Sequence, residues 1–266
     1  HSFPTRRSSD LGGGDNAVSA IGVGAVSPGD AFISLGTSGV LFVVTDAYRP
    51  APQSAVHAFC HVLPNLWHQM SVMLSAASCL QWFCRLVGVT ELALLEEIAQ
   101  LSDAEKASAP MFLPYLSGER TPHNDPCARG MFWGLTHSSQ RALMGYAVLE
   151  GVSFGIADGL RVLQESGTQI EQCSLVGGGA RSPFWAQLLA DILAMPVVTH
   201  KGGETGGALG AARLACLAAG KPLASVCEKP EVYKTWRSDP ARHRALMTRY
   251  QQFNALYQND LNYRNP

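Results

Sequence analysis

The stretch Gly12-Gly13-Gly14-Asp15-Asn16-Ala17 sets three glycines before a carboxylate, at the point where an apolar helical pattern begins. Glycine lets the backbone approach a ligand closely, and the pattern predicts that Asp15 lies at the N-cap or in the first turn of a helix. The positive end of the helix dipole favours an ionised carboxylate there. Such a carboxylate on a glycine-lined floor is suited to orient and deprotonate a hydroxyl group. The same residues also fit a simpler role, in which Asp15 only caps the helix.

A second glycine-containing turn follows a short way along the chain. Residues 31–44 contain two β-rich runs around Gly36-Thr37-Ser38-Gly39, and this pattern predicts a β-hairpin. The backbone N–H groups and hydroxyls of such a turn converge on one point, as they do in phosphate-binding loops. Because glycine and serine are also favoured in ordinary hairpin turns, this turn alone does not establish a phosphate site.

A third glycine run separates a short strand from a helix. Residues 173–176 predict a buried strand, and Gly177-Gly178-Gly179-Ala180 joins it to a helix predicted over residues 183–193. This order is typical of nucleotide sites at the carboxyl end of a strand. The contiguous glycines do not match the dinucleotide fingerprint, so a dinucleotide-dependent oxidoreductase is the weakest interpretation. A fourth run, residues 202–207, leads into a helix predicted over residues 208–219.

The rest of the chain alternates strand-like and helix-like patterns. Ser75 is a candidate N-cap for an apolar helix that ends at Gly88. Residues 111–134 are rich in proline and charged side chains, and they predict a long ordered loop that binds a ligand or, alternatively, a solvated connection. The other predicted elements are strands over residues 55–61, 67–74 and 197–198, and helices over residues 91–101, 138–163 and 240–261.

Glycines also recur inside the longest predicted helix. Gly151, Gly155 and Gly159 share one face at four-residue spacing. Each costs about 1 kcal/mol of helix propensity relative to alanine, so the stripe needs a physical reason. We expect close packing against another element, rather than flexing of the helix.

Three histidines lie in the predicted strand region. His57, His61 and His68 raise the question of a metal site, because the first two would share one strand face. No carboxylate is grouped with them. The pattern therefore favours ordinary polar positions over a metal centre.

The composition excludes several classes of partner. The 266 residues are 47% hydrophobic and 15% charged, enough for one large or two small domains, and the formal net charge is -1. No cluster of Lys and Arg appears outside Arg6-Arg7, so the sequence predicts neither nucleic-acid binding nor a membrane surface, and a small molecule is the expected partner. The seven cysteines show no CxxC spacing, which indicates reduced thiols and a cytoplasmic protein. The sequence predicts no signal peptide or membrane span.

The first eleven residues differ in character from the rest. HSFPTRRSSDL shows neither helical nor strand period, and we interpret residues 1–11 as a non-native or disordered tail. Native sequence would then begin near Gly12. Anything that the site needs from an upstream segment would be absent, and residues 12–266 would form one domain.

Four glycine-rich turns in a neutral chain indicate α/β architecture and a phosphate-bearing ligand, without the Walker spacing. In this order they resemble the FGGY carbohydrate kinases of the actin-like ATPase superfamily. The resemblance implies a ribonuclease H-like domain with a mixed sheet flanked by helices, and it covers nearly everything from Gly12 onward. The motifs that carry it are GGGDNA (12–17), SLGTSG (34–39), PYLSGERTPHNDP (114–126), ARGMFWGLTH (128–137), AVLEGVSFGIADG (147–159), GGGARS (177–182) and GGALGAARLA (206–215).

The resemblance implies ATP-dependent phosphorylation of a ketopentose, and the SGERTPHNDP loop favours D-xylulose, giving D-xylulose 5-phosphate. Asp15 matches the family's general base, and magnesium is expected through the ATP phosphates, with no metal ligand from this chain. The positions matched to nucleotide binding are Gly14, Gly36, Thr37, Ser38, Gly178, Gly179 and Ala180. The positions matched to substrate or interdomain contacts are Asn16, Glu119, Arg120, Gly206 and Gly207.

The chain also departs from the family pattern. Family members carry a preceding sugar-binding domain, which we expect to be missing here, and we therefore expect this C-terminal ATP-binding domain to be inactive alone. The alternative is a non-kinase actin-like module for regulation or assembly, in which Asp15 serves hydrolysis or only structure. The SGERTP loop favours the kinase, because a regulatory ATPase has no need of that element. The sequence leaves a homodimer open.

Overall fold

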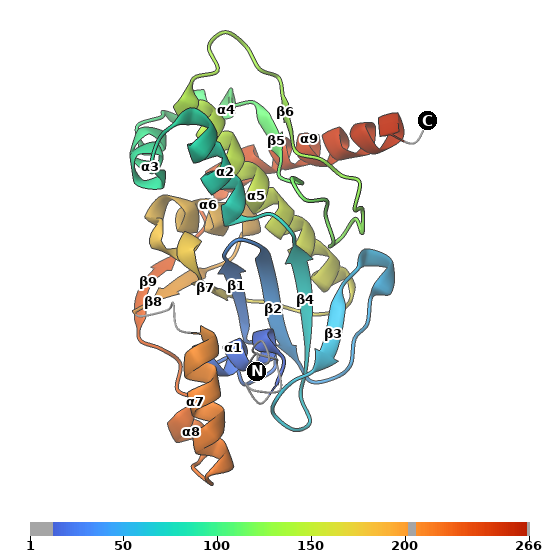
Figure 1. The fold of residues 1–266 in the computed structure, drawn as a ribbon, viewed down its shortest axis with the longest axis vertical. Helices are drawn as coiled ribbons and strands as arrows, with labels where there is room; N and C mark the ends of the chain where they lie inside the picture. The colour runs from blue at the N-terminus through green and yellow to red at the C-terminus, as the bar shows by residue number, and fades with distance from the viewer. Residues whose placement is uncertain (1–12, 202–205, 265–266) are drawn as a thin grey trace, which may run out of the picture.

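A seven-stranded mixed sheet organises the protein (Figure 1). The computed structural model describes residues 13–201 and 206–264. The predicted tail at residues 1–11, Gly12 and part of the fourth glycine run lie outside the described residues. The strands of this sheet follow the order β3-β4-β2-β1-β7-β8-β9, and β5 and β6 form a separate pair.

Strands and helices are mixed along the chain, as the sequence predicts for α/β architecture. The helices are α1 (Asp15–Val23), α2 (Ala77–Val87), α3 (Glu91–Ala99), α4 (Asp103–Ala107), α5 (Arg141–Glu165), α6 (Pro183–Leu193), α7 (Gly206–Ala218), α8 (Leu223–Val226) and α9 (Pro240–Arg264). The strands are β1 (Ala31–Leu35), β2 (Gly39–Thr45), β3 (His57–Cys60), β4 (Trp67–Met73), β5 (Met111–Leu113), β6 (Met131–Trp133), β7 (Cys173–Val176), β8 (Val197–His200) and β9 (Val232–Trp236).

Helices cover both faces of the sheet. Alternate residues of β1 point to opposite sides, so Ile33 joins the larger core formed with α2, α5, α6 and α9, while Phe32 joins a smaller core with α1. Figure 1 shows α2, α3, α5 and α6 gathered toward one end of the molecule and α1, α7 and α8 toward the other. The mixed sheet with flanking helices confirms the predicted fold class.

The long helix α5 runs through the larger core, and its glycines meet other elements closely. A Cβ added at Gly151 would lie 2.2 Å from the carbonyl oxygen of Phe112, and one at Gly159 would lie 2.2 Å from Ser71 Oγ. These distances confirm the predicted close packing. By length and composition α5 could cross a membrane, contrary to the sequence expectation, but its apolar window is mostly buried inside this domain.

Several predicted element boundaries were wrong, because contacts and exposure in the folded chain decided them. Ser75 is not the N-cap of α2: the N-cap is Ala76, and its N–H and that of Ala77 donate to carbonyl oxygens of the 36–38 turn. The predicted loop 111–134 begins and ends in the paired strands β5 and β6. The edge strand β9 was missed because its residues are mostly exposed and lack a buried apolar alternation.

A buried ion pair joins α5 to α9. Glu150 is fully buried and accepts hydrogen bonds from Arg249 Nε at 2.7 Å, Arg249 Nη2 at 2.6 Å and the Tyr146 hydroxyl at 3.1 Å. Burial raises the pKa of Glu150, while the bonds from Arg249 oppose that rise. Arg249 also donates to the carbonyl oxygens of Ala107 and Ala109, so one guanidinium ties α9 to both α5 and the chain before β5.

We predict that Gly151→Ala lowers the free energy of unfolding by about 3 kcal/mol, because the new methyl group meets a backbone carbonyl that cannot move aside. Gly155→Ala is the matched control. Its methyl group would meet the flexible end of Met73, at 2.6 Å from Cε, so we expect a change below about 1 kcal/mol. Urea unfolding of both variants measures the difference, and equal losses would contradict the packing argument.

We predict that Arg249→Met lowers the free energy of unfolding by about 3–5 kcal/mol, because it leaves the Glu150 carboxylate buried without its cation. Arg141→Met, which removes the more exposed pair with Glu97, should lower the free energy of unfolding much less, because solvent screens that pair. Chemical denaturation at pH 7 compares the two. If both variants lost a similar amount of stability, burial of the Glu150–Arg249 pair would not increase its effect on the free energy of unfolding.

Candidate nucleotide and catalytic site

Two of the predicted glycine turns leave neighbouring strands at the same edge of the sheet. β1 and β7 pair in parallel, with Phe32 opposite Ser174 and Ser34 opposite Val176. The 36–38 turn follows β1, and the turn at Gly177 with its 3-10 helix Gly178–Arg181 follows β7. Because the carboxyl ends of parallel strands meet at one edge, the two turns lie side by side.

Close approach between these turns requires glycine. Gly177 has φ +85°, and a Cβ there would lie 2.9 Å from the Leu35 carbonyl oxygen. A Cβ at Gly179 would lie 2.4 Å from Leu35 Cδ2. Leu35 directly precedes Gly36, so these contacts bring the predicted adenosine turn, with Gly178 and Ala180, against the predicted phosphate turn.

The 36–38 turn is held from behind by α2. The carbonyl oxygen of Thr37 accepts from Ala76 N at 2.9 Å and from Ser78 Oγ at 2.7 Å, and that of Gly36 accepts from Ala77 N at 2.8 Å. The side chains of Thr37 and Ser38 are exposed. Among the described hydrogen bonds, none uses the N–H groups of Thr37 and Ser38. Two amide donors and two hydroxyls are therefore available to an anion.

Asp15 occupies the first turn of α1, as predicted, and Gly14 is the N-cap. The Asp15 side chain is exposed, and its Oδ1 accepts from Asn16 N at 2.8 Å and from Asn16 Nδ2 at 3.3 Å. Its other oxygen, Oδ2, makes no hydrogen bond with any described residue. One carboxylate oxygen is thus held by the neighbouring residue and the other is open to a ligand.

Gly206 and Gly207 lie over α1, one helical turn beyond Asp15. A Cβ at either glycine would approach Ser19 at 3.6 Å. The α1 and α7 backbones come still closer farther along, where a Cβ at Gly22 would lie 1.9 Å from the Gly206 carbonyl oxygen. Arg213 of α7 donates to the carbonyl oxygens of Ile21 and Gly22. This crossing joins the start of α7 to the helix that carries Asp15.

Glu119 and Arg120 differ sharply in exposure. Glu119 is 3% exposed and accepts backbone hydrogen bonds from Leu74 and Arg120, whereas the Arg120 side chain is exposed. Arg120 is therefore the member of the pair that can reach a substrate or another domain.

The predicted residues thus fall into local groups in the structure. The two turns lie together, Gly206 and Gly207 approach Ser19 in the helix that Asp15 begins, and Glu119 is bonded to Leu74, two residues before Ala76. No hydrogen bond or ion pair between described residues joins Asp15 to either turn. Sequence reasoning missed Ala76, Ala77 and Ser78, whose small side chains gave no signal and which support the phosphate turn through their backbone and hydroxyl groups.

The three histidines do not form a metal site. Within the described ranges no group of three His, Cys, Asp or Glu side chains is arranged to hold a metal ion. His61 and His68 are buried, with ring centroids 6.2 Å apart, and His68 stacks on Phe42 at 4.6 Å. Burial lowers the pKa of His61 to about 4, and burial together with the neighbouring His61 lowers the pKa of His68 to about 4. Two of the expected polar positions are thus core positions.

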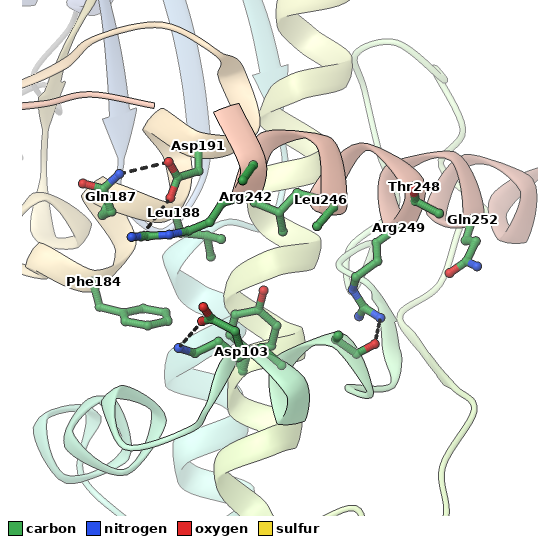
Figure 2. Close-up of a pocket in the computed structure, with 15 residues that line it drawn as sticks. Asp103, Phe184, Gln187, Leu188, Asp191, Arg242, Leu246, Thr248, Arg249 and Gln252 are labelled. Atoms are coloured by element: carbon green, nitrogen blue, oxygen red, sulfur yellow. Dashed lines mark hydrogen bonds and ion pairs between the residues drawn. The ribbon is translucent and has the colours of Figure 1, made fainter. Parts of the chain in front are cut away.

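A pocket of about 600 Å³ lies away from all the predicted site residues, between α4, α5, α6 and α9 (Figure 2). Phe184, Leu188 and Leu246 supply part of its wall, and Asp191, Arg242 and Arg249 lie along it with their charges already paired. Its volume would suit a small ligand. The glycine turns and Asp15 line no part of it, so this pocket contains none of the residues predicted to bind nucleotide or to act as base.

The comparisons with known proteins agree with this geometry. Residues 31–219 match the C-terminal domain of the FGGY family of carbohydrate kinases. The chain belongs to the FGGY family. It is 49% identical over 249 residues to the xylulose kinase of Escherichia coli K12, covering 93% of this chain and 51% of that protein. It is 51% identical over 207 residues to the xylulose kinase of Klebsiella pneumoniae, covering 78% of this chain and 42% of the relative.

Solved structures support the same FGGY assignment and the actin-like ATPase fold. The structure titled as a xyloylose kinase from Brucella ovis superposes with TM-score 0.88 at 48% identity, covering 93% of this chain and 51% of that one. A glycerol kinase from Plasmodium falciparum with ADP shares the fold, with TM-score 0.80 at 19% identity, over 92% of this chain and 50% of that one. The chain therefore spans about half the length of the xylulose kinases that it matches.

The buried histidines predict a pH dependence of stability. A histidine whose pKa is 6.5 in the unfolded chain and about 4 in the folded protein takes up its proton preferentially on unfolding, so stability is lost as the pH falls from 6.5 toward 4. The loss is on the order of 3 kcal/mol for each residue.

Urea unfolding of the wild-type protein and a His68→Phe variant, at pH 7 and pH 5, measures this effect. The variant should lose less stability than the wild type over that interval, because its residue 68 does not titrate. The difference between the two proteins removes the contributions of Asp158 and Glu119, whose burial raises each pKa, to about 6 and about 7. If both proteins lost the same stability between pH 7 and pH 5, the pH dependence could not be assigned to His68.

Proposed function

We propose that this chain is the ATP-binding half of a kinase that converts D-xylulose to D-xylulose 5-phosphate. The observation that carries the proposal is an exposed first-turn carboxylate, Asp15, in the same domain as two adjoining glycine turns, in a chain about half identical to proteins named xylulose kinase. The sugar contacts that complete the site would come from sequence outside this chain, and the chain alone would be inactive. None of the seven cysteines is paired in a disulfide, which is consistent with the proposed cytoplasmic location.

In this proposal the two turns divide the nucleotide between them. The free N–H groups and hydroxyls of Thr37 and Ser38 bind phosphate oxygens of ATP, and Gly178, Gly179 and Ala180 hold the adenosine. Magnesium, bound through the phosphates, would offset their negative charge during transfer. In this proposal the metal is held through the ATP phosphates and takes no ligand from this chain.

Asp15 acts as the general base. Its free oxygen Oδ2 accepts the proton of the sugar hydroxyl as that oxygen attacks the γ-phosphate, while Oδ1 stays bound to Asn16. Asn16, Arg120, Gly206 and Gly207 are proposed to contact the sugar or the domain that carries it. The close contact between α7 and α1 would hold Asp15 in a fixed position relative to the two glycine turns.

The actin-like regulatory module is the weaker alternative. The relatives named above and the structure from Brucella ovis are named as sugar kinases, and the SGERTP loop is bonded to the end of β4 through Glu119 and Thr121. The structure of a gluconate kinase from Lactobacillus acidophilus also superposes, with TM-score 0.79 at 27% identity over 94% of this chain, so a related sugar is the closer competitor.

The test joins this chain to the part of the Escherichia coli relative that it does not cover, and measures ADP release with D-xylulose, L-ribulose, gluconate and glycerol. We predict turnover with D-xylulose that falls about 10²–10⁴-fold in Asp15→Asn, with little change in the KM for ATP. Asp103→Asn, an exposed first-turn carboxylate of α4, is the matched control and should retain activity. Full turnover in Asp15→Asn would remove its role as base, and a preference for another sugar would overturn the substrate assignment.

A further inference from the structure

Glu119 is a buried carboxylate that forms no ion pair with any residue the structure describes. Its residue is 3% exposed, and its Oε1 accepts hydrogen bonds from Leu74 N at 2.9 Å and Arg120 N at 2.7 Å. Its Oε2 is buried and makes no hydrogen bond to any described residue. Burying a carboxylate in this way is unfavourable, so the position calls for a reason other than stability.

The loop that carries Glu119 is bonded to the end of β4. Thr121 N donates to the Val72 carbonyl oxygen at 3.0 Å, and Val72 N donates to Thr121 Oγ1 at 3.0 Å. Thr121 Oγ1 donates in turn to the Ala55 carbonyl oxygen at 2.9 Å. Together with the bond from Leu74 to Glu119, these contacts fix the last residues of β4 against residues 119–121.

The residues just after Leu74 hold the phosphate turn. Two residues beyond Leu74, Ala76 N donates to the Thr37 carbonyl oxygen, and Ala77 N donates to that of Gly36. β4 also pairs with β2 where Met73 lies opposite Gly39, the residue that ends the turn. A shift of the backbone at Leu74 would therefore move the donors that orient Thr37 and Ser38.

We propose that Glu119 is a positioning residue for the 36–38 turn. It fixes Leu74 and thereby the start of α2, which bonds to the turn. The free N–H groups of the turn then point at the phosphates of the nucleotide. The inference rests on the proposed function for the identity of the ligand. Glu119 is not assigned a contact with the substrate, because its side chain is buried and bonded to the backbone of Leu74 and Arg120. It acts through Leu74, Ala76 and Ala77.

The hydrogen bond from Leu74 N to Glu119 should also depend on pH, because of the groups that surround the Glu119 carboxyl. Burial raises the pKa of Glu119 to about 7, against the effect of the two backbone hydrogen bonds; Asp158 of α5 raises it further and Arg120 lowers it. Cys79 of α2 and Tyr115 also face Glu119, and burial raises the pKa of each, so both stay neutral. An ionised Glu119 accepts the Leu74 N–H more strongly than a protonated one. The hold on the turn should therefore tighten as the pH rises through 7.

The test compares Glu119→Gln, which keeps an acceptor oxygen for Leu74, with Glu119→Ala, which removes it. Glu150→Gln is the matched control, because Glu150 is also buried but is bonded to Arg249 away from the turn. All are made in the chain as it stands. Circular dichroism first establishes that each variant is folded.

The first measurement is amide hydrogen exchange without nucleotide. In Glu119→Ala, exchange at Ala76 and Ala77 should accelerate about tenfold or more, because their acceptors on the turn are no longer held. In Glu119→Gln and Glu150→Gln it should stay near the wild-type rate. Unchanged exchange at these amides in Glu119→Ala would overturn the inference, whether or not the protein binds ATP.

The second measurement is titration calorimetry with ATP and magnesium. Affinity should fall about tenfold in Glu119→Ala, with Glu119→Gln and Glu150→Gln close to the wild type at pH 7. Between pH 8 and pH 6 the wild type should lose more affinity than Glu119→Gln, which does not titrate there. Equal pH profiles, or equal losses in Glu119→Ala and Glu150→Gln, would overturn the positioning role. If neither the wild-type chain nor the fused kinase binds ATP, the proposed function is refuted. The hydrogen-exchange result would still test whether Glu119 positions the 36–38 turn.

Discussion

Parallel pairing of β1 with β7 is the constraint on which the site depends. A parallel pair must be joined by a crossover, and here the connection from β1 to β7 contains β2 to β6 and α2 to α5. The return places two glycine turns, more than a hundred residues apart in sequence, at one edge of one sheet. Leu35 then sets their spacing, because Gly177 and Gly179 both pack against it. The meeting of the two turns is therefore a consequence of strand order, with glycine where the two backbones would collide.

Close backbone approach recurs wherever two elements must stay in register. α5 meets Phe112 and Ser71 through glycines, and α1 meets α7 through Gly22 and Gly210. Such contacts leave no side chain that could repack, so each pair of elements has one relative position. The contact between α1 and α7 lies in the helix that begins at Asp15.

The local elements were predictable from the sequence, and the contacts between them were not. The hairpin at residues 31–44, the strand before Gly177 and the helix from Pro183 follow from turn chemistry and apolar periodicity. The predicted N-cap of α2 was wrong because the first N–H groups of that helix bond to a turn about forty residues earlier in the chain. No local sequence pattern indicates such a contact. Burial of Glu119 and of His61 depends in the same way on segments distant in sequence. The Asp15 helix was found, since three glycines before a carboxylate are a local pattern.

The loop that carries Glu119 depends on contacts with α9. Tyr257 and Arg264 of α9 both donate to Asp125, and Arg249 bonds to the residues just before β5. Because α9 follows this loop in the sequence, the loop lacks these contacts during synthesis until α9 has also emerged from the ribosome. A chain cut before α9 would lose the support that Asp125 gives to the loop carrying Glu119.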